Sequence, residues 1–307
     1  MPRTAPGLRT DPTPRLAELG RQRPEWRAWL GMLGEVLPLL DDPVWASSLS
    51  DSISESGTGR SSAADPLLQG RDLVVDTRRL RGLVHRLAEI TAAEGVPDAA
   101  ALGGYRPSAD TVVHLLAAAI RHDREGIGEL AAAAGVDPGA LETVAQLTAV
   151  PLLQCCGRLL QEQVPVSWTH GYCPICGSWP LLGEFRSLDR TRRLRCGRCA
   201  GDWRINWLRC PYCGERDHER LGSLVLEDKL ETLTVETCLH CSGYLKSVTT
   251  LQAIPPFELL LWDLETVELD IAALDRGYAR PESVGFPLDV RVTARAPGGC
   301  GGPGAND

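Results

Sequence analysis

Long apolar runs are missing from the sequence. None of the apolar stretches in its 307 residues approaches the roughly 18 residues that a membrane-spanning helix needs. Residues 1–8 also lack the apolar core of a secretory signal. We therefore expect a cytoplasmic protein with no membrane insertion. Because the cytoplasm is reducing, we expect most of its 11 cysteines to serve as metal ligands and not as disulfides.

The motifs of common enzyme classes are missing too. The sequence has no Ser-His-Asp order typical of a nucleophilic triad, no HExxH zinc motif and no glycine-rich phosphate loop. A net charge of −8 disfavours general binding to the polyanionic backbone of nucleic acids. The sequence thus disfavours a plain hydrolase or dehydrogenase, and we expect no nucleic-acid partner, with a local basic patch left open.

The first half of the chain has the apolar periodicity of α-helices. We expect a helical N-terminal domain over residues 1–165, interrupted by a mobile loop at 46–66 that is rich in Ser, Gly and Asp. Ser108 is a plausible N-cap, and Asp137-Pro138 is a good start for a long helix with a kink near Pro151. The expected helices cover residues 12–45, 72–94, 108–122, 125–134 and 137–162.

Four Cys-x-x-Cys pairs dominate the second half, and their grouping is typical of two four-thiolate metal sites. Pairing neighbours gives one site from the first two pairs and one from the last two, whereas a crossed pairing would need interleaved loops. An iron–sulfur cluster, a redox dithiol or a disulfide fits this pattern less well, and the spacing does not separate zinc from iron. The expected ligands are Cys173, Cys176, Cys196 and Cys199 for the first site, and Cys210, Cys213, Cys238 and Cys241 for the second.

Two of the four pairs, one in each site, share a Cys-Pro-x-Cys-Gly pattern with a physical reason. Proline presets φ after the first cysteine, and glycine accepts the positive φ that follows the second. Such a turn, or knuckle, points backbone N–H groups at a thiolate and offsets part of its negative charge. The alternation of these pairs with plainer ones indicates an internal repeat.

Between the knuckles the apolar period changes to two, which predicts β-strands. Each unit is expected to be a zinc-ribbon or rubredoxin-like module, too small to fold without its ion. The predicted class is α+β: a mainly α-helical N-terminal domain, two tandem modules and a C-terminal helix near 265–277. The expected boundaries are 168–208 for the first module, 209–255 for the second, 256–290 for the C-terminal helix and extension, and 291–307 for a disordered tail.

The run from Trp168 to about Leu288 resembles the formate dehydrogenase accessory protein FdhE family. The matching features form an ordered series, which is more specific than any single Cys-x-x-Cys pair. They are residues 171–178 (GYCPICGS) with Pro180, residues 194–199 (LRCGRC) with Trp203, residues 210–213 (CPYC), residues 238–246 (CLHCSGYLK), and residues 277–281 (GYARP) before Phe286-Pro287.

This resemblance implies an assembly factor and not an enzyme. Its implied partner is the catalytic subunit of respiratory formate dehydrogenase, which it would bind in the cytoplasm. The resemblance also implies two bound metal ions, with iron favoured and zinc an alternative, held by the eight cysteines named above. Whether copies of the chain form a homo-oligomer is left open.

Two alternative functions remain at the sequence level. A zinc-ribbon protein that binds nucleic acid would use the arginine-rich stretch 186–198. A rubredoxin-like protein would transfer electrons or sense redox state through iron. For an assembly factor, the expected partner surface includes residues 203–208 and 244–246, although Trp203 and Trp207 are more typical of packing around an ion.

Overall fold

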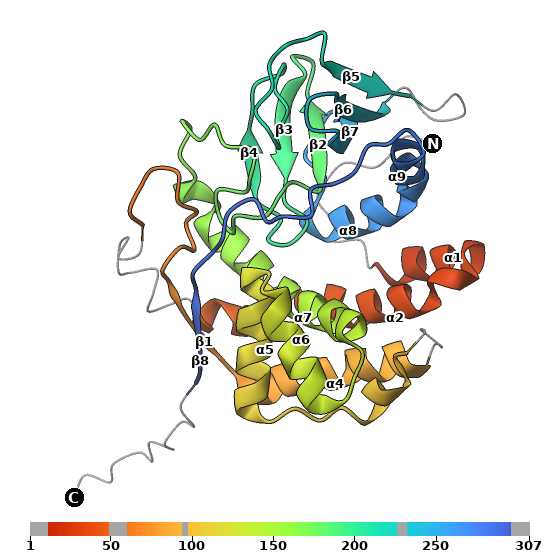
Figure 1. Ribbon diagram of the computed structural model, residues 1–307, viewed down its shortest axis with the longest axis vertical. Coiled ribbons are helices and arrows are strands. Elements are labelled where there is room, and N and C mark those ends of the chain that lie inside the picture. Colours follow the sequence, from red (N-terminus) through yellow and green to blue (C-terminus); the bar gives the residue numbers. More distant parts are fainter. Residues whose placement is uncertain (1–11, 49–59, 94–97, 226–231, 296–307) are drawn as a thin grey trace, which may run out of the picture.

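The computed structural model of the protein describes residues 12–48, 60–93, 98–225 and 232–295 (Figure 1). A helical part built by the first half of the chain lies against a six-stranded sheet built by the second half. Two further helices lie beside the sheet. The predicted α+β class, with a helical first half and two four-cysteine modules, is confirmed.

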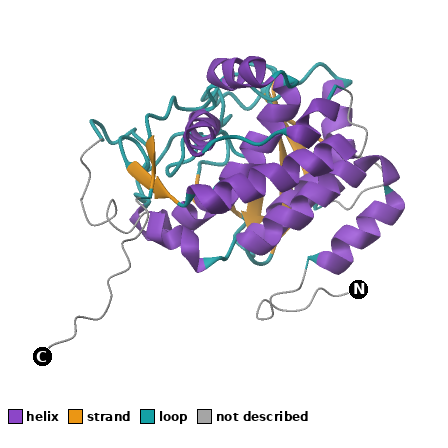
Figure 2. Ribbon diagram, turned by 90° about the horizontal axis from the view of Figure 1, so that it is seen from below, coloured by secondary structure: helices purple, strands orange, loops and turns teal. Residues whose placement is uncertain are grey.

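The helical part packs around one long central helix, α7. Viewed from below, its helices lie in front of most of the strands (Figure 2). Within the described residues, no helix combines the length and apolarity needed to cross a membrane. The helices are α1 (Thr13–Gln22), α2 (Arg27–Val36), α4 (Thr77–Ala93), α5 (Ala109–Arg121), α6 (Arg124–Ala134) and α7 (Pro138–Leu160).

Local capping signals set the starts of two of these helices as expected. The Ser108 hydroxyl accepts a hydrogen bond from the backbone N–H of Thr111 at 3.0 Å and begins α5. Asp137 caps α7 in the same way through the N–H of Ala140 at 2.7 Å. These side chains satisfy N–H groups that the first helical turn leaves unpaired.

The six-stranded sheet has the order β4-β3-β2-β7-β6-β5 and joins both cysteine modules. All neighbours are antiparallel except the central pair β2 and β7, which is parallel. Each module contributes three consecutive strands, so the second module continues the sheet of the first. The strands are β2 (Leu182–Arg186), β3 (Thr191–Arg195), β4 (Asp202–Arg204), β5 (Leu221–Leu224), β6 (Leu233–Cys238) and β7 (Tyr244–Thr250).

Two helices, α8 (Pro256–Glu265) and α9 (Val267–Leu274), cover one face of this sheet. Leu259 of α8 packs with Leu182 and Val248, and Leu269 of α9 packs with Val235. The sequence predicted one helix near 265–277 and missed α8. The apolar run Phe257–Trp262 has no clear 3.6-residue period, which is the signal that identifies a helix.

A short parallel pair of strands joins the segment before α4 to the C-terminal end of the described chain. β1 (Asp72–Val75) pairs with β8 (Arg291–Ala294) in register from Asp72–Arg291 to Val75–Ala294. Two expectations are therefore corrected: residues 72–75 are a strand and not the start of a helix, and residues 291–294 do not belong to a disordered tail. Leu73 and Val75 of β1 and Val292 of β8 are buried, and the two strands need each other as hydrogen-bonding partners.

Two expected features lie outside the described residues. They are the centre of the loop at 46–66 and the end of the tail, residues 296–307. The domain boundaries at 165, 208 and 255 stay predictions. The main hydrophobic core nevertheless continues from α7 into the first cysteine module, because Cys156 and Cys176 belong to the same cluster of buried residues.

Candidate metal sites

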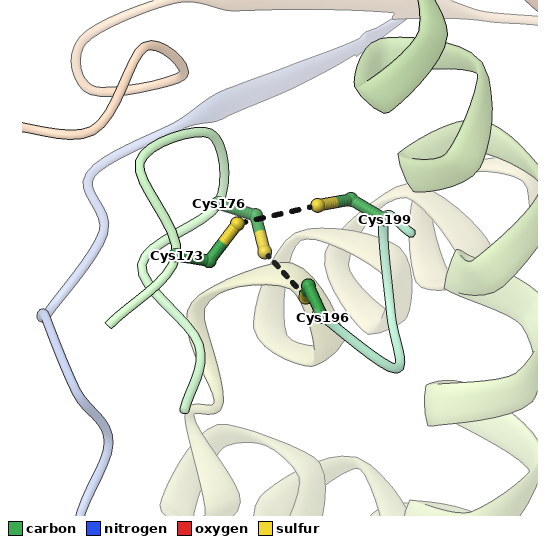
Figure 3. Close-up of side chains that lie close together, drawn as sticks. All are labelled: Cys173, Cys176, Cys196 and Cys199. Carbon is green, nitrogen blue, oxygen red and sulfur yellow. Dashed lines mark hydrogen bonds between the residues drawn. The ribbon is translucent and has the colours of Figure 1, made fainter. Parts of the chain in front are cut away.

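The first cysteine set brings four sulfur atoms together from two knuckles. Cys173 and Cys176 precede β2, whereas Cys196 and Cys199 lie between β3 and β4 (Figure 3). The Sγ atoms of Cys173 and Cys199 are 3.4 Å apart, and those of Cys176 and Cys196 are 3.5 Å apart. All four lie within 4.8 Å of one another. Four thiolates bound tetrahedrally at about 2.3 Å are separated by about 3.8 Å, so this set fits a single ion.

The second set repeats this arrangement. Cys210 and Cys213 precede β5, Cys238 is the last residue of β6, and Cys241 lies between β6 and β7. Its closest sulfur pairs, Cys210–Cys241 and Cys213–Cys238, are both 3.7 Å apart. The structure thus groups neighbouring pairs and not crossed ones. Metal binding by the eight cysteines stays a prediction, which this donor geometry fits.

The knuckles have the backbone geometry that their sequence indicates. Gly177 and Gly214 follow the second cysteine of each Pro-type pair with φ of +75° and +81°. In the first knuckle the N–H of Ile175 lies 3.4 Å from the Sγ of Cys173. The plainer knuckles also match each other, since Ala200 and Ser242 occupy equivalent positions with φ of +57° and +54°. These paired conformations support the internal repeat.

Burial strongly affects the thiols of the first set. It raises the pKa of Cys173 and of Cys199 well above the ordinary value. Hydrogen bonds from Cys173 and the other two thiols lower the pKa of Cys176 instead. A cation is required to hold several thiolates in so apolar a place, and its binding would release protons. The set is therefore suited to a thiophilic ion.

The thiols of the second set are shifted less uniformly. Burial raises the pKa of Cys241 to about 11 and also raises that of Cys210. Burial acts in the same direction on Cys238. The pKa of Cys238 is nevertheless below the ordinary value, because its sulfur accepts several hydrogen bonds. The donors are the N–H groups of Cys241 and His240 and the thiols of Cys213 and Cys210. Backbone N–H groups thus stabilise the thiolate that a metal needs.

A polar network that the sequence did not reveal connects the first set to α5. Arg198, inside the second knuckle, donates to the backbone carbonyls of Ala119 and Ile120 at 2.7 and 3.2 Å. It also lies 2.8 Å from His122 Nε2, which in turn lies 3.1 Å from Ser178 Oγ. Burial, followed by the charge of Arg198, lowers the pKa of His122 to about 3. The imidazole is therefore a neutral acceptor at ordinary pH.

The histidines nearest the knuckles are not part of either set. In the described chain, both four-residue groups consist of cysteine alone. His170 stacks on Tyr172, and His240 is exposed beside Glu215. Cys155 and Cys156 are buried in α7. Trp203 is buried and donates its indole N–H to the carbonyl of His170 at 3.2 Å, which is the packing role expected for it.

The arginine-rich stretch does not form a basic surface. Arg192 and Arg195 are buried and pair with Glu236 and Glu184, respectively. Arg193 pairs with Asp202. Because β3 alternates its side chains between two covered faces, these arginines bind acids of neighbouring strands. The arginine-rich stretch therefore gives no support to the hypothesis of nucleic-acid binding.

Part of the expected partner surface is also buried. Tyr244, Leu245 and Lys246 are no more than 4% exposed, since β7 is a central strand that pairs with β2 and β6. In contrast, Trp207 is half exposed and packs on Phe185 with ring centroids 4.7 Å apart. These rings border a hollow of about 290 Å³ whose lining includes Cys210 and Cys238.

Several curated proteins are similar to part of this chain, and no family model matches it. The FdhE homologue of Stutzerimonas stutzeri is 37% identical over 111 residues, which are 35% of each chain. The homologue of Aquifex aeolicus is 29% identical over 121 residues, and the Escherichia coli protein FdhE is 31% identical over 111 residues. These matches cover 41% and 35% of those two proteins, so the chain spans less than half of each curated relative.

A solved structure extends the likeness to most of the chain. The crystal structure of the FdhE protein from Pseudomonas aeruginosa matches with a TM-score of 0.51 over 88% of this chain and 90% of that chain. At 24% sequence identity, this likeness establishes a shared fold. The sequence similarity thus covers about a third of the chain, and the structural likeness extends the shared fold to most of it.

Proposed function

We propose that the protein is an accessory factor for the assembly or activation of respiratory formate dehydrogenase, and not an enzyme itself. In this proposal it acts in the cytoplasm and binds the catalytic subunit of that enzyme. The observation that carries the proposal is the FdhE-like fold over 88% of the chain, combined with the two four-cysteine sets of the family's ordered motif series.

We also propose that each set holds one metal ion through four thiolates. The first ion is held by Cys173, Cys176, Cys196 and Cys199, and the second by Cys210, Cys213, Cys238 and Cys241. Iron is favoured by the family resemblance, and zinc is the alternative. Four sulfur ligands leave no coordination position for an activated water, which supports a role in folding and recognition.

The chain's own residues explain why such an ion would matter for recognition. Each ion would fix two knuckles and with them the ends of three strands in the sheet, β2, β3 and β4 for the first ion and β5, β6 and β7 for the second. Small modules of this type gain much of their folding free energy from the metal. A surface presented by the sheet, such as the one around Trp207 and Phe185, would then have a defined shape only in the loaded protein.

A deletion strain tests the function. Loss of the gene is expected to abolish most respiratory formate dehydrogenase activity, and the wild-type gene is expected to restore it. Cys176→Ser, in the first set, is expected to fail to restore it, while Cys300→Ser, a cysteine outside both sets, is expected to succeed. Normal formate dehydrogenase activity in the deletion strain would falsify the proposal.

Binding and metal content are measured separately on the purified protein. The catalytic subunit is expected to copurify with the tagged wild-type protein and not with an unrelated protein carrying the same tag. Elemental analysis is expected to give about two ions per chain, one for each four-thiolate site. Two irons with thiolate-to-iron absorption would be consistent with an additional role in redox sensing. Two zincs, which give no such absorption, would indicate a structural role for the metal sites.

A further inference from the structure

The two cysteine sets have the same local geometry but very different surroundings. All four cysteines of the first set are no more than 1% exposed and belong to the main hydrophobic core. In the second set, Cys213 and Cys241 are exposed. None of its four cysteines belongs to a described cluster of buried apolar residues.

The first set is enclosed by residues from the helical half. Gly157 of α7 lies so close to the Cys199 carbonyl that a Cβ atom there would stand 1.9 Å from the oxygen. The N–H groups of Leu67 and Leu68 donate to the carbonyls of Pro174 and Ile175 at 2.7 and 3.0 Å. A reagent therefore reaches these sulfurs only after the packing between the helical part and the sheet opens.

Arg198 adds an electrostatic clamp to this enclosure. Among the described residues it makes no ion pair with a carboxylate. Its hydrogen bonds go to the last carbonyls of α5 and to His122. The thiolates of the first set and the negative end of the α5 dipole are thus its counter-charges. A four-thiolate site around a divalent ion carries a net negative charge that this guanidinium offsets.

The repeat places His240 in the second set where Arg198 lies in the first. Each is the third residue of its Cys-x-x-Cys pair. The His240 side chain is 54% exposed and lies near Glu215 and Arg220. Leu239 beside it is 63% exposed. The second set therefore has neither the core cover nor the cationic clamp of the first.

We propose that the two sites have different roles: the first is a permanent structural centre that joins the helical part to the sheet, and the second is the exchange centre. At the second site the exposed Cys213 and Cys241 would let a soft donor, such as a thiolate or a chelator, reach the bound ion. The cysteine thiolate that this donor displaces would take a proton from water. This inference rests on the metal binding proposed above but not on the link to formate dehydrogenase.

Metal release from the zinc-loaded full-length protein tests this assignment. With excess of the coloured chelator 4-(2-pyridylazo)resorcinol, we expect two phases of one zinc each. Their rates should differ by about tenfold or more, equivalent to about 1.4 kcal/mol in opening free energy. N-ethylmaleimide present during the fast phase is expected to label the second set, as read by peptide mass spectrometry. A single phase, or earlier labelling of the first set, overturns the proposal.

Matched substitutions at the equivalent knuckle positions sharpen the test. Arg198→Met is expected to accelerate the slow phase at least several-fold and to leave the fast phase unchanged. His240→Met is the control, and it is expected to leave the slow phase unchanged. Equal effects of the two substitutions on the slow phase contradict the proposed clamp.

A variant of the second set keeps the test decisive if Arg198→Met does not fold. Cys241→Ser is expected to remove the fast zinc while the slow zinc and the helical circular dichroism remain. Loss of both zincs from Cys241→Ser shows that the sites are not independent and overturns the division of roles. If the wild-type chain binds fewer than two zincs, the premise of two metal sites is refuted. The link to formate dehydrogenase is tested separately by the deletion strain.

Discussion

At the scale of single residues, the family motif contains more than its cysteines, and the structure gives the other positions physical roles. Ser178 hydrogen-bonds to His122, and Arg280 pairs with Asp263 and Asp270. The N–H of Phe286 donates to the carbonyl of Gly177 at 2.9 Å. The contacts of Ser178 and Phe286 join the first knuckle to other parts of the chain, and Arg280 joins the segment after α9 to α8 and α9. The motif therefore describes how the two modules are held in place as well as their ligands.

Gly171 gives the sharpest steric prediction. A Cβ atom at this position would stand 1.6 Å from the backbone oxygen of Pro211, where the first module packs on the second. Gly171→Ala is expected to lower the free energy of unfolding by about 1–3 kcal/mol or more, because backbone must move to relieve the overlap. Gly128→Ala, in α6 with no atom within 4 Å of the new Cβ, is the control and is expected to stabilise by about 0.5–1 kcal/mol. Urea unfolding of both variants measures the difference.

His122 gives a prediction about pH. Its pKa is lowered to about 3 in the folded protein from an ordinary value of 6.5, because of burial and the Arg198 charge. Between these values the unfolded chain takes up a proton that the folded chain refuses, so the free energy of unfolding falls as pH decreases. His122→Gln has no such titrating group, so acid does not destabilise it in this way. The difference in the free energy of unfolding between wild type and His122→Gln is therefore expected to be smaller at about pH 5.5 than at about pH 8. A deficit that is the same at both pH values contradicts the assigned pKa shift.

At the scale of elements, the sequence predicted what local chemistry decides and missed what distant pairing decides. The start of α5 at Ser108 and the start of α7 at Asp137 need only a side chain and the following turn. The four knuckles likewise depend on short motifs. By contrast, residues 72–75 are expected to begin a helix and form a strand only because β8 lies beside them. The parallel pairing of β2 with β7 also joins segments far apart in sequence, and no local signal specifies it.

A buried ion network holds α8 and α9 against the sheet, and Lys246 is its centre. The Lys246 ammonium is 1% exposed and lies 2.7 Å from carboxylate oxygens of both Asp263 and Asp270. Burial acts to raise the pKa of Asp263, but Arg280 and Lys246 lower it below the ordinary value. Asp263 is therefore charged at neutral pH and depends on its cationic partners.

Removing one partner of this network should be costly. Lys246→Met leaves two acids with Arg280 alone, and it is expected to lower the free energy of unfolding by about 3–5 kcal/mol. The double variant Lys246→Met with Asp270→Asn is expected to lose less than the sum of the two single variants, because the groups act as one network. Chemical denaturation of the four proteins in this cycle gives the coupling, and strictly additive losses contradict a shared network.

At the scale of the whole molecule, the halves of the sequence are interlocked in three places. The first cysteine set lies in the core beside α7. Arg15 of α1 donates to Glu265 of α8 at 2.6 Å and also pairs with Glu258. β8 returns to β1, where Arg291 pairs with Asp72 at 2.7 Å. A partner that contacts the sheet therefore meets a surface whose position depends on the helical part as well.

The β1–β8 pair offers a test of this interlocking by truncation. A chain ending at Pro287 loses the buried side chains of Leu288, Val290 and Val292. Burial of a Leu or Val side chain contributes about 1.5–3 kcal/mol, so this chain is expected to melt several degrees lower than the full-length protein. A chain ending at Arg295 keeps β8 and the hydrogen bond from the Arg295 N–H to the Val75 carbonyl at 2.8 Å.

The second truncation is the matched control, since it removes only residues 296–307. It is expected to melt at the full-length temperature when both proteins carry the same metal. Thermal unfolding followed by circular dichroism at the helical band compares the three chains. If the chain ending at Pro287 melts with the full-length protein, β8 does not stabilise the helical part. If the chain ending at Arg295 melts early, residues 296–307 stabilise the fold, and the expectation of a disordered tail is wrong for them too.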